Sequence, residues 1–158
     1  MPKQIVLTRG YVTSVCDCHS HLVINQKWRV TFSENKPYAI RTCMVDGSRK
    51  MIFLHKVINR TPDGLHTDHI NGDTLDNKCI NLRAATCSQN LCNRGKTIKN
   101  TSGFKGVHWD NQRNRWRARI VANGKVICLG RYNTALDAAK AYDAGAIKYH
   151  GKFSKTNF

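Results

Sequence analysis

Alternating apolar and polar positions characterise the first third of the chain. Apolar side chains occupy every second position of 28–32, and further apolar runs follow at 38–41 and 51–54. Turn-forming residues separate these runs at 35–37 and 46–48. Apolar residues that alternate with a period of two, interrupted by turn-forming residues, are typical of antiparallel strands. We therefore expect a set of small antiparallel strands here.

The pattern changes between residues 59 and 94, where apolar residues become sparse and His, Asp and Asn become dense. This segment opens with a turn at Thr61-Pro62-Asp63-Gly64. Its composition indicates that the needs of a functional site, more than core packing, determine which residues occur in this segment. The basic and polar stretch that follows at 95–102 predicts a linker.

Residues 103–158 predict a compact unit of three strands and one helix. Strand-like runs lie at 104–109, 116–121 and 126–129. The pair Asn123-Gly124 between two apolar runs is the strongest short-range signal for a hairpin.

The helix of this unit is expected to begin after Thr134, a good N-cap residue. Asp137 lies three positions further on and completes a variant of the capping box. Apolar and mostly small residues then share one face at helical spacing, namely Ala135, Ala138, Ala139, Tyr142 and Ala146. Small side chains on that face predict that the helix lies close to the sheet.

The charge balance narrows the choice of partner. The chain has 158 residues, with 26 Lys and Arg against 10 Asp and Glu and a formal net charge of +16. Such an excess favours a polyanion, because neutralised phosphates release their counterions. An anionic membrane would select a basic amphipathic helix, and the sequence shows neither that nor a membrane-spanning apolar run. The charge therefore favours a nucleic acid over a membrane. The motifs described below specify double-stranded DNA, and no obligate protein partner is expected.

The cysteines and the N-terminal residues bear on the compartment and on zinc. No secretory signal is recognisable, so a cytoplasmic location with reduced thiols is expected. Seven cysteines are an odd number, which argues against a disulfide framework. The spacings Cys16-x-Cys18 and Cys87-x4-Cys92 match zinc fingers poorly, and no Cys-x-x-Cys pair occurs. The spacing thus predicts no structural Zn²⁺, and a zinc-stabilised structural or RNA-binding protein stays open as a third hypothesis.

The polar segment holds the residues that phosphodiester hydrolysis needs: a base for water, a cation for the growing charge, and groups that orient both. His69 can be the base, because a neutral imidazole is available near pH 7. Asp68 points to the other side of an extended strand and can bind a metal. Asn90, in an expected short helix at 88–93, can add an amide oxygen, and Asn93 one turn away could substitute for it. Oxygen ligands suit Mg²⁺, with Mn²⁺ able to replace it.

These residues, in this order, resemble the HNH endonuclease motif of the homing type. Asp68-His69 opens the motif, Asn81 precedes Leu82-Arg83, and Asn90 follows in a helix. The resemblance implies a strand–loop–strand–helix unit around one metal ion. It also implies Asp68 and Asn90 as metal ligands, His69 as general base, and Asn81 as the residue that orients the base.

His55 belongs to a stretch, Leu54-His55-Lys56-Val57-Ile58, that resembles the element preceding the motif in these proteins. A catalytic role and a packed or capping role are both open for it, because Leu54 and Val57 beside it are apolar. Asp73, Asp76 and Asn77 are interpreted as turn formers.

A row of arginines distinguishes the last third of the chain. Arg113, Arg115, Arg117 and Arg119 alternate with apolar residues, which places the four guanidinium groups on one face of a strand. These positive charges repel one another on that face unless a bound anion neutralises them. A sheet face of this kind can enter the major groove, where arginine contacts guanine edges and phosphates.

This segment resembles an AP2 domain, a three-stranded sheet backed by one helix. The matching stretches include Ser102–Val107, Arg115–Ile120, Leu129–Tyr132, Ala138–Asp143 and the final Asn157-Phe158. The resemblance implies that Lys105, His108, Arg115, Arg117 and Arg119 face DNA. Val126 and Cys128 replace the third-strand residues of the plant members, so the plant target sequence is not expected.

The sequence as a whole predicts an α+β protein. Small N-terminal antiparallel strands lead into a ββα-metal HNH nuclease domain at 1–94, with its motif core at 54–93. A basic linker at 95–102 and an AP2-like DNA-binding domain at 103–158 follow, the latter a three-stranded antiparallel sheet plus one helix. The expected function is metal-dependent, site-specific DNA cleavage. The alternative is a non-catalytic AP2-type DNA-binding regulator with a decayed nuclease region, against which the complete set of motif residues argues.

Overall fold

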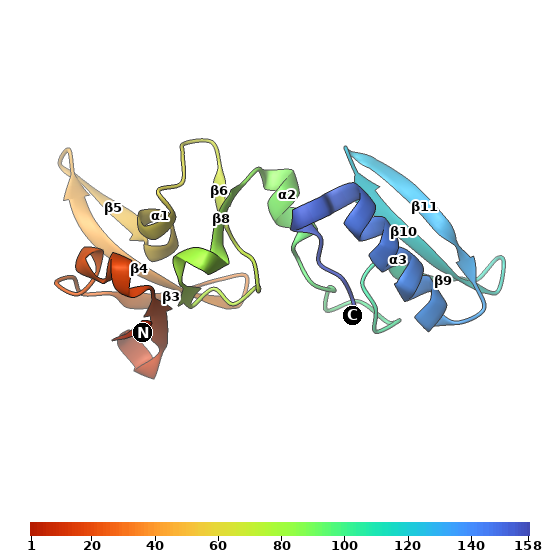
Figure 1. The fold of residues 1–158 in the computed structure, drawn as a ribbon, viewed down its shortest axis with the longest axis horizontal. Helices are drawn as coiled ribbons and strands as arrows, with labels where there is room; N and C mark the ends of the chain where they lie inside the picture. Colours follow the sequence, from red (N-terminus) through yellow and green to blue (C-terminus); the bar gives the residue numbers. More distant parts are fainter. The chain divides into compact units, whose positions relative to one another are not determined.

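The computed structural model describes residues 1–158, which fold as two compact units, Met1–Asn90 and Leu91–Phe158 (Figure 1). The chain is of the α+β class, with several small antiparallel sheets and a long C-terminal helix. None of its helices has the length and apolar character needed to cross a membrane.

The largest sheet of the first unit is antiparallel, in the order β3 (Arg29–Ser33), β4 (Lys36–Val45) and β5 (Ser48–Phe53). The two turns between these strands adopt positive φ at polar residues, as the sequence pattern requires of tight hairpins. The expected strand at 51–54 ends one residue early, because Leu54 starts the helix α1 (Leu54–Asn59). His55 therefore lies on a helix.

A second sheet joins segments that are distant in sequence. β1 (Lys3–Val6) pairs antiparallel with β2 (Val12–Val15), and β2 pairs in parallel with the two-residue strand β7 (Asp76–Asn77). Short 3-10 turns flank these strands at Thr8–Gly10 and Asp17–Leu22. The parallel pair places the N-terminal residues directly beside the polar segment.

The polar segment itself forms a two-stranded antiparallel ribbon followed by a helix. β6 (His66–His69) pairs with β8 (Leu82–Ala85), and a 3-10 turn at Cys79–Asn81 precedes β8. The helix α2 (Cys87–Cys92) starts two residues after β8 ends. The order strand, loop, strand, helix is thus present.

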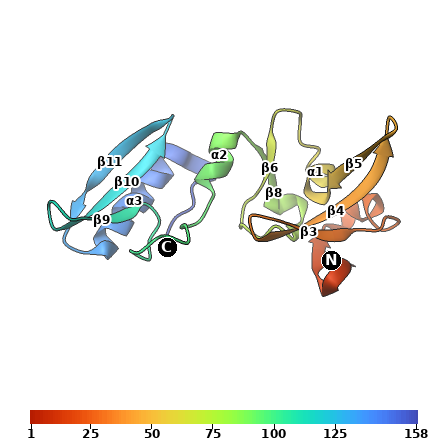
Figure 2. The same cartoon turned by 180° about the vertical axis from the view of Figure 1, so that it is seen from behind.

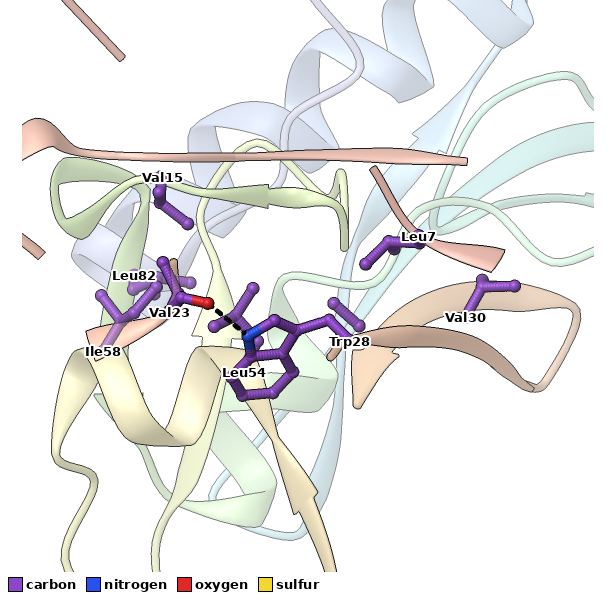
Figure 3. Packing of buried hydrophobic residues seen from close by; sticks show 9 residues of the cluster. Leu7, Val15, Val23, Trp28, Val30, Leu54, Ile58 and Leu82 are labelled. Carbon is purple, nitrogen blue, oxygen red and sulfur yellow. Dashed lines mark hydrogen bonds between the residues drawn. The ribbon is translucent and has the colours of Figure 1, made fainter. Parts of the chain in front are cut away.

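One hydrophobic core holds the first unit together (Figure 3). Side chains from several of its elements meet in it, including Val15 of β2, Val30 of β3, Leu54 of α1 and Leu82 of β8. The indole Nε1 of Trp28 donates a hydrogen bond of 3.1 Å to the carbonyl of Val23, which satisfies the buried N–H. The polar ribbon is therefore anchored to the core through α1 and β8.

The second unit is a three-stranded antiparallel sheet with one helix packed on one face. The strand order is β11 (Lys125–Tyr132), β10 (Arg115–Ala122) and β9 (Val107–Asp110), and α3 (Ala135–His150) lies across them, as Figures 1 and 2 show from two sides. A final 3-10 turn covers Gly151–Phe153. The hairpin between β10 and β11 turns at Asn123-Gly124, both with positive φ, as expected.

The small face of α3 packs as the sequence predicts. Thr134 caps the helix by accepting the N–H of Asp137 at 3.1 Å. The buried face carries Ala138, Ala139, Tyr142 and Ala146.

Gly106 lies where the packing of the second unit leaves no room for a side chain. Its φ is +74°, and a Cβ built on it would lie 2.0 Å from Cδ2 of Tyr142 and 2.9 Å from the carbonyl oxygen of Arg119. The backbone N–H of Arg119 in turn donates to the carbonyl of Gly106 at 2.9 Å. The expected strand at 104–109 consequently begins only at Val107.

The stretch expected to be a linker, 95–102, is folded into the second unit. Nδ2 of Asn100 donates to the carbonyl of Phe104 at 2.7 Å, and the Ser102 hydroxyl contacts the carbonyls of Phe104 and Val107. These bonds tie the stretch to the start of β9.

Candidate functional site

The end of β6 carries a buried carboxylate held by an arginine across the ribbon. The β6–β8 register places Asp68 opposite Arg83. Nε and Nη2 of Arg83 lie 2.7 Å and 2.6 Å from Oδ2 of Asp68, whose residue is only 3% exposed. Arg83 thus gives this deeply buried carboxylate an ion-pair partner. In the sequence, Arg83 stood out only as a residue flanking the motif, and no local pattern indicated this contact.

His69, the next residue, is held by a chain of hydrogen bonds that fixes its tautomer. Its Nε2 lies 3.2 Å from Oδ1 of Asn77, and Nδ2 of Asn77 donates to the Thr13 hydroxyl at 2.8 Å. Thr13 uses its own proton on the carbonyl of Leu75 at 2.7 Å. Since Thr13 can then only accept from Asn77, the amide oxygen of Asn77 faces His69. Nε2 of His69 must therefore be the donor, and Nδ1 is its basic nitrogen.

A second buried histidine lies against the first. The rings of His55 and His69 have centroids 5.2 Å apart and meet edge to face, and Tyr38 contacts both. Burial lowers the pKa of His69, although the bond to Asn77 and the charge of Asp68 oppose the shift. Burial, with the neighbouring His69 and Lys56, lowers the pKa of His55 to about 3. Both rings are thus neutral at pH 7.

Asn81 makes different contacts from those expected. Its Oδ1 accepts the N–H of Asn71 at 3.0 Å, and its Nδ2 donates to Oδ1 of Asn71 and to the carbonyl of Asp76. The residue that bonds the ring of His69 is Asn77, which the sequence analysis had interpreted as a turn former. Asn81 instead closes the loop between β6 and β8 on which Asn77 lies.

Asn90 lies in the middle of α2, whose start is well defined. Thr86 and Gln89 form a reciprocal capping box: the Thr86 N–H donates to Oε1 of Gln89 at 2.8 Å, and the Gln89 N–H donates to the Thr86 hydroxyl at 3.2 Å. This supports capping by Thr86. The helix ends at Cys92, so Asn93 lies beyond it, in the second unit.

Four further side chains with metal-binding chemistry meet on the first unit. The ligand atoms of Cys16, Cys18, His19 and Cys79 all lie within 4.8 Å of one another. The expectation of no structural zinc rested on spacing along the chain, which compares neighbouring cysteines only. Cys79 comes from a segment 63 residues away from Cys16, and the β2–β7 pair brings the two together.

The arginine row of β10 lies on the sheet face opposite α3. Ala118 and Ile120 are buried under the helix, whereas Arg115 and Arg119 are exposed. The register sets Arg117 between His108 of β9 and Arg131 of β11. Partial burial lowers the pKa of His108, and the charges of Arg119 and Arg117 act in the same direction, which places the three groups together.

The structure adds Arg131 to this basic face. In the sequence, Arg131 stood out only as part of the AP2-like stretch. Its Nε is 3.0 Å from Oδ2 of Asp110, and this contact lowers the pKa of Asp110. Arg113, expected on the same strand face as the other arginines, instead lies in the turn before β10, where its N–H donates to the carbonyl of Asp110.

Lys105 departs from the expected arrangement. Its Nζ donates to the carbonyl of Cys92 at 2.6 Å and lies 5.9 Å from the ring centroid of Tyr142, on the helix side of the sheet. Burial lowers the pKa of Lys105. The expectation rested on the position of Lys105 in the AP2-like stretch. In the structure Gly106, whose φ is positive, separates Lys105 from β9, and the ammonium group lies away from the arginine row.

Comparisons with known proteins fall on the same two segments. A family model described as HNH endonuclease matches residues 60–92, and one described as AP2 domain matches residues 102–152. The chain carries an HNH domain and an AP2 domain. The HNH match includes Asp68, His69, Asn81 and Asn90, and the AP2 match includes β9 to β11 and α3.

Individual relatives come from a phage and from plants. Protein 3.8 of Escherichia phage T7 is a homologue, 41% identical over 64 residues, which are 40% of this chain and 53% of that protein. The AP2-like ethylene-responsive transcription factor ANT of Arabidopsis thaliana is 44% identical over 62 residues, 38% of this chain and 11% of that protein. CRL5 of Oryza sativa subsp. japonica, also named an AP2-like ethylene-responsive transcription factor, is 42% identical over 62 residues, 38% of this chain and 10% of that protein. The matched stretches thus span about half of the phage protein and a small part of each plant factor.

Proposed function

We propose that this chain is a metal-dependent, site-specific DNA endonuclease of the homing type. The observation that carries the proposal is the Asp68-His69 pair at the end of β6, where a buried carboxylate adjoins a neutral imidazole of fixed tautomer. The HNH match over the same residues supports it, and the AP2 domain implies DNA binding.

The chemical step assigned to His69 is removal of a proton from water. Nδ1 takes the proton as the water oxygen attacks phosphorus, and the bond from phosphorus to the leaving 3′-oxygen breaks. The leaving oxygen gains a proton from solvent. Asn77 holds the ring through Nε2–H, so that the lone pair of Nδ1 keeps its direction, and Asn81 stabilises the loop that carries Asn77.

Asp68 and Asn90 are the residues proposed to hold a divalent cation. Their donors are a carboxylate and an amide oxygen, a set that suits Mg²⁺, with Mn²⁺ as a substitute. Arg83 fits this assignment because its ion pair with Asp68 fixes the orientation of the carboxylate. When bound, the cation neutralises charge on the phosphate and on the leaving oxygen.

The basic face of β9 to β11 is proposed to select the site. Arg115, Arg117, Arg119, Arg131 and His108 present donors to guanine edges and phosphates in the major groove. The Nε–H of Arg117 is buried and has no acceptor within the protein. A contact of Arg117 with DNA would therefore use the terminal Nη atoms of its guanidinium group.

Cleavage of supercoiled plasmid tests the proposal directly. The plasmid carries the DNA that flanks the gene, and gel-filtered protein is added with Mg²⁺, with Mn²⁺ or without a divalent cation. We expect nicked or linear product only when a cation is present, and the product form shows whether one strand or both are cut. Tight binding to the same plasmid with no product under any condition would favour the non-catalytic AP2-type regulator instead.

A matched pair of variants tests the assignment of the DNA-binding face. Arg117→Ala is expected to weaken binding to the cognate duplex by roughly 5- to 150-fold, the range of about 1–3 kcal/mol for a good base contact. Lys105→Ala removes the same charge from the second unit but should leave DNA affinity nearly unchanged, since its ammonium group contacts Cys92 and Tyr142. Fluorescence anisotropy with a labelled duplex measures both. Equal losses of affinity would show that Lys105 also faces the DNA.

A further inference from the structure

Three thiols and an imidazole converge on the first unit outside the nuclease site. Cys16 and Cys18 flank the start of the 3-10 turn Asp17–Leu22, His19 lies within it, and Cys79 starts the turn Cys79–Asn81. The Sγ atoms of Cys16 and Cys79 are 3.0 Å apart, and Sγ of Cys18 is 3.2 Å from Nδ1 of His19. All four ligand atoms lie within 4.8 Å of one another.

Hydrophobic packing does not account for this cluster. Cys18 and Cys79 are exposed and Cys16 and His19 are half-buried, and none of the four belongs to the hydrophobic core of the unit. The backbone N–H of Cys79 also donates to Sγ of Cys16 at 3.1 Å, so a main-chain donor points at the cluster as well. Thiol and imidazole groups gathered on the surface from two distant segments are the ligands that a soft or borderline divalent cation binds.

We propose that Cys16, Cys18, His19 and Cys79 form a structural zinc site. Zn²⁺ prefers four thiolate and imidazole ligands in a tetrahedron, with bonds near 2.3 Å to sulfur and 2.0–2.1 Å to nitrogen. Such a tetrahedron has ligand-to-ligand edges of about 3.6–3.8 Å. The observed separations, from 3.0 Å to at most 4.8 Å, bracket these values, so movements of about 1 Å would complete the site.

The ligand chemistry selects zinc over the other assignments. Sulfur and imidazole ligands are soft, which excludes the Mg²⁺ proposed for Asp68 and Asn90. A disulfide between Cys16 and Cys79 would require a bond near 2.04 Å and would leave Cys18 and His19 without a role. A Cys₃His set uses all four groups.

The site would connect the two chain segments that carry Thr13 and Asn77, the residues whose contacts hold the ring of His69. Cys16 directly follows β2, which carries Thr13, and Cys79 follows β7, which carries Asn77. The β2–β7 ladder is only two residues long on the β7 side, so backbone pairing alone holds it weakly. Zinc would clamp the open end of this ladder and so stabilise the Thr13–Asn77 contact.

Metal analysis of the purified full chain tests the site without reference to DNA cleavage. Protein is expressed with zinc, purified under reducing conditions and dialysed, and its zinc is measured by mass spectrometry. We expect one equivalent per chain in the wild type and in the control Cys128→Ser, which changes an exposed cysteine of the second unit. Cys18→Ser and Cys79→Ser should lose the bound zinc, whereas Asp68→Ala should retain it.

Cobalt substitution of the wild type provides a readout that needs no variant to fold. Co²⁺ in the proposed site should give thiolate-to-metal charge-transfer absorption and the strong visible bands of a tetrahedral centre. A spectrum without the charge-transfer absorption would overturn the proposal, as would zinc that Asp68→Ala removes. A metal-free chain that is lighter by two hydrogen atoms under non-reducing conditions, and whose peptide map joins Cys16 to Cys79, would show a disulfide in place of the zinc site.

Discussion

Replacing His69 by alanine is expected to lower the rate of DNA cleavage by about 10²–10⁴-fold, the usual contribution of a general base. The ring is the proposed proton acceptor, and the other imidazole of β6, that of His66, is exposed. Affinity for DNA should stay close to that of the wild type, because the basic face of the second unit is unchanged. Cleavage of plasmid in Mg²⁺, measured beside gel shifts on the same DNA, separates the two effects.

The matched control for this variant is His66→Ala. His66 starts the strand that His69 ends, but its side chain is exposed. Its loss should leave the cleavage rate near the wild-type value. If His69→Ala cut at the wild-type rate, the base would have to be another group, and His55 with its ring 5.2 Å away would be the first to replace next.

Replacing Gly106 by alanine is expected to unfold the second unit or to lower its stability by about 3 kcal/mol or more, adding backbone strain to overpacking. The new Cβ would lie 2.0 Å from the ring of Tyr142, which is itself buried under the sheet. It would also lie 2.9 Å from the Arg119 carbonyl, which the strand holds in place. Neither neighbour can withdraw without breaking the packing of α3 on β10.

Gly124→Ala separates the effect of the clash from that of the backbone angle. Gly124 has a φ of +73°, against +74° for Gly106, but nothing lies within 4 Å of its Cβ position. It should cost only about 1 kcal/mol, the penalty of the left-handed conformation. Thermal unfolding followed by tryptophan fluorescence compares the two. Equal shifts in Tm would mean that Tyr142 yields to the added methyl group.

The second unit was largely predictable because the residues that determine its turns, cap and strand faces are close together in the sequence. The Asn123-Gly124 turn, the Thr134 cap and the alternation of arginines with apolar residues each depend on residues a few positions apart. Lys105 was expected to face DNA from its place in the AP2-like stretch, and that inference could not anticipate its contacts with Cys92 and Tyr142 beside the turn at Gly106.

The surroundings of the proposed catalytic pair, Asp68 and His69, were less predictable because they are assembled from distant segments. The motif indicated Asp68 and His69, but the contacts of these residues with Arg83 and Asn77 follow from strand register and from the β2–β7 pair. A two-residue parallel strand leaves no periodic signal. The convergence of Cys79 with Cys16 is hidden for the same reason, since spacing patterns describe ligands that are close along the chain.

The Thr13–Asn77 contact also determines which fragment of the chain could be transferred to another protein as a nuclease unit. A fragment that begins where the HNH match begins, at residue 60, would contain Asp68 and His69 but would lose both β2 and the core residues of β3 and α1. Grafts of the proposed nuclease unit onto another DNA-binding protein should therefore retain the first strands as well. Insertions within 12–15 are expected to abolish the proposed DNA cleavage as thoroughly as changes in the motif itself.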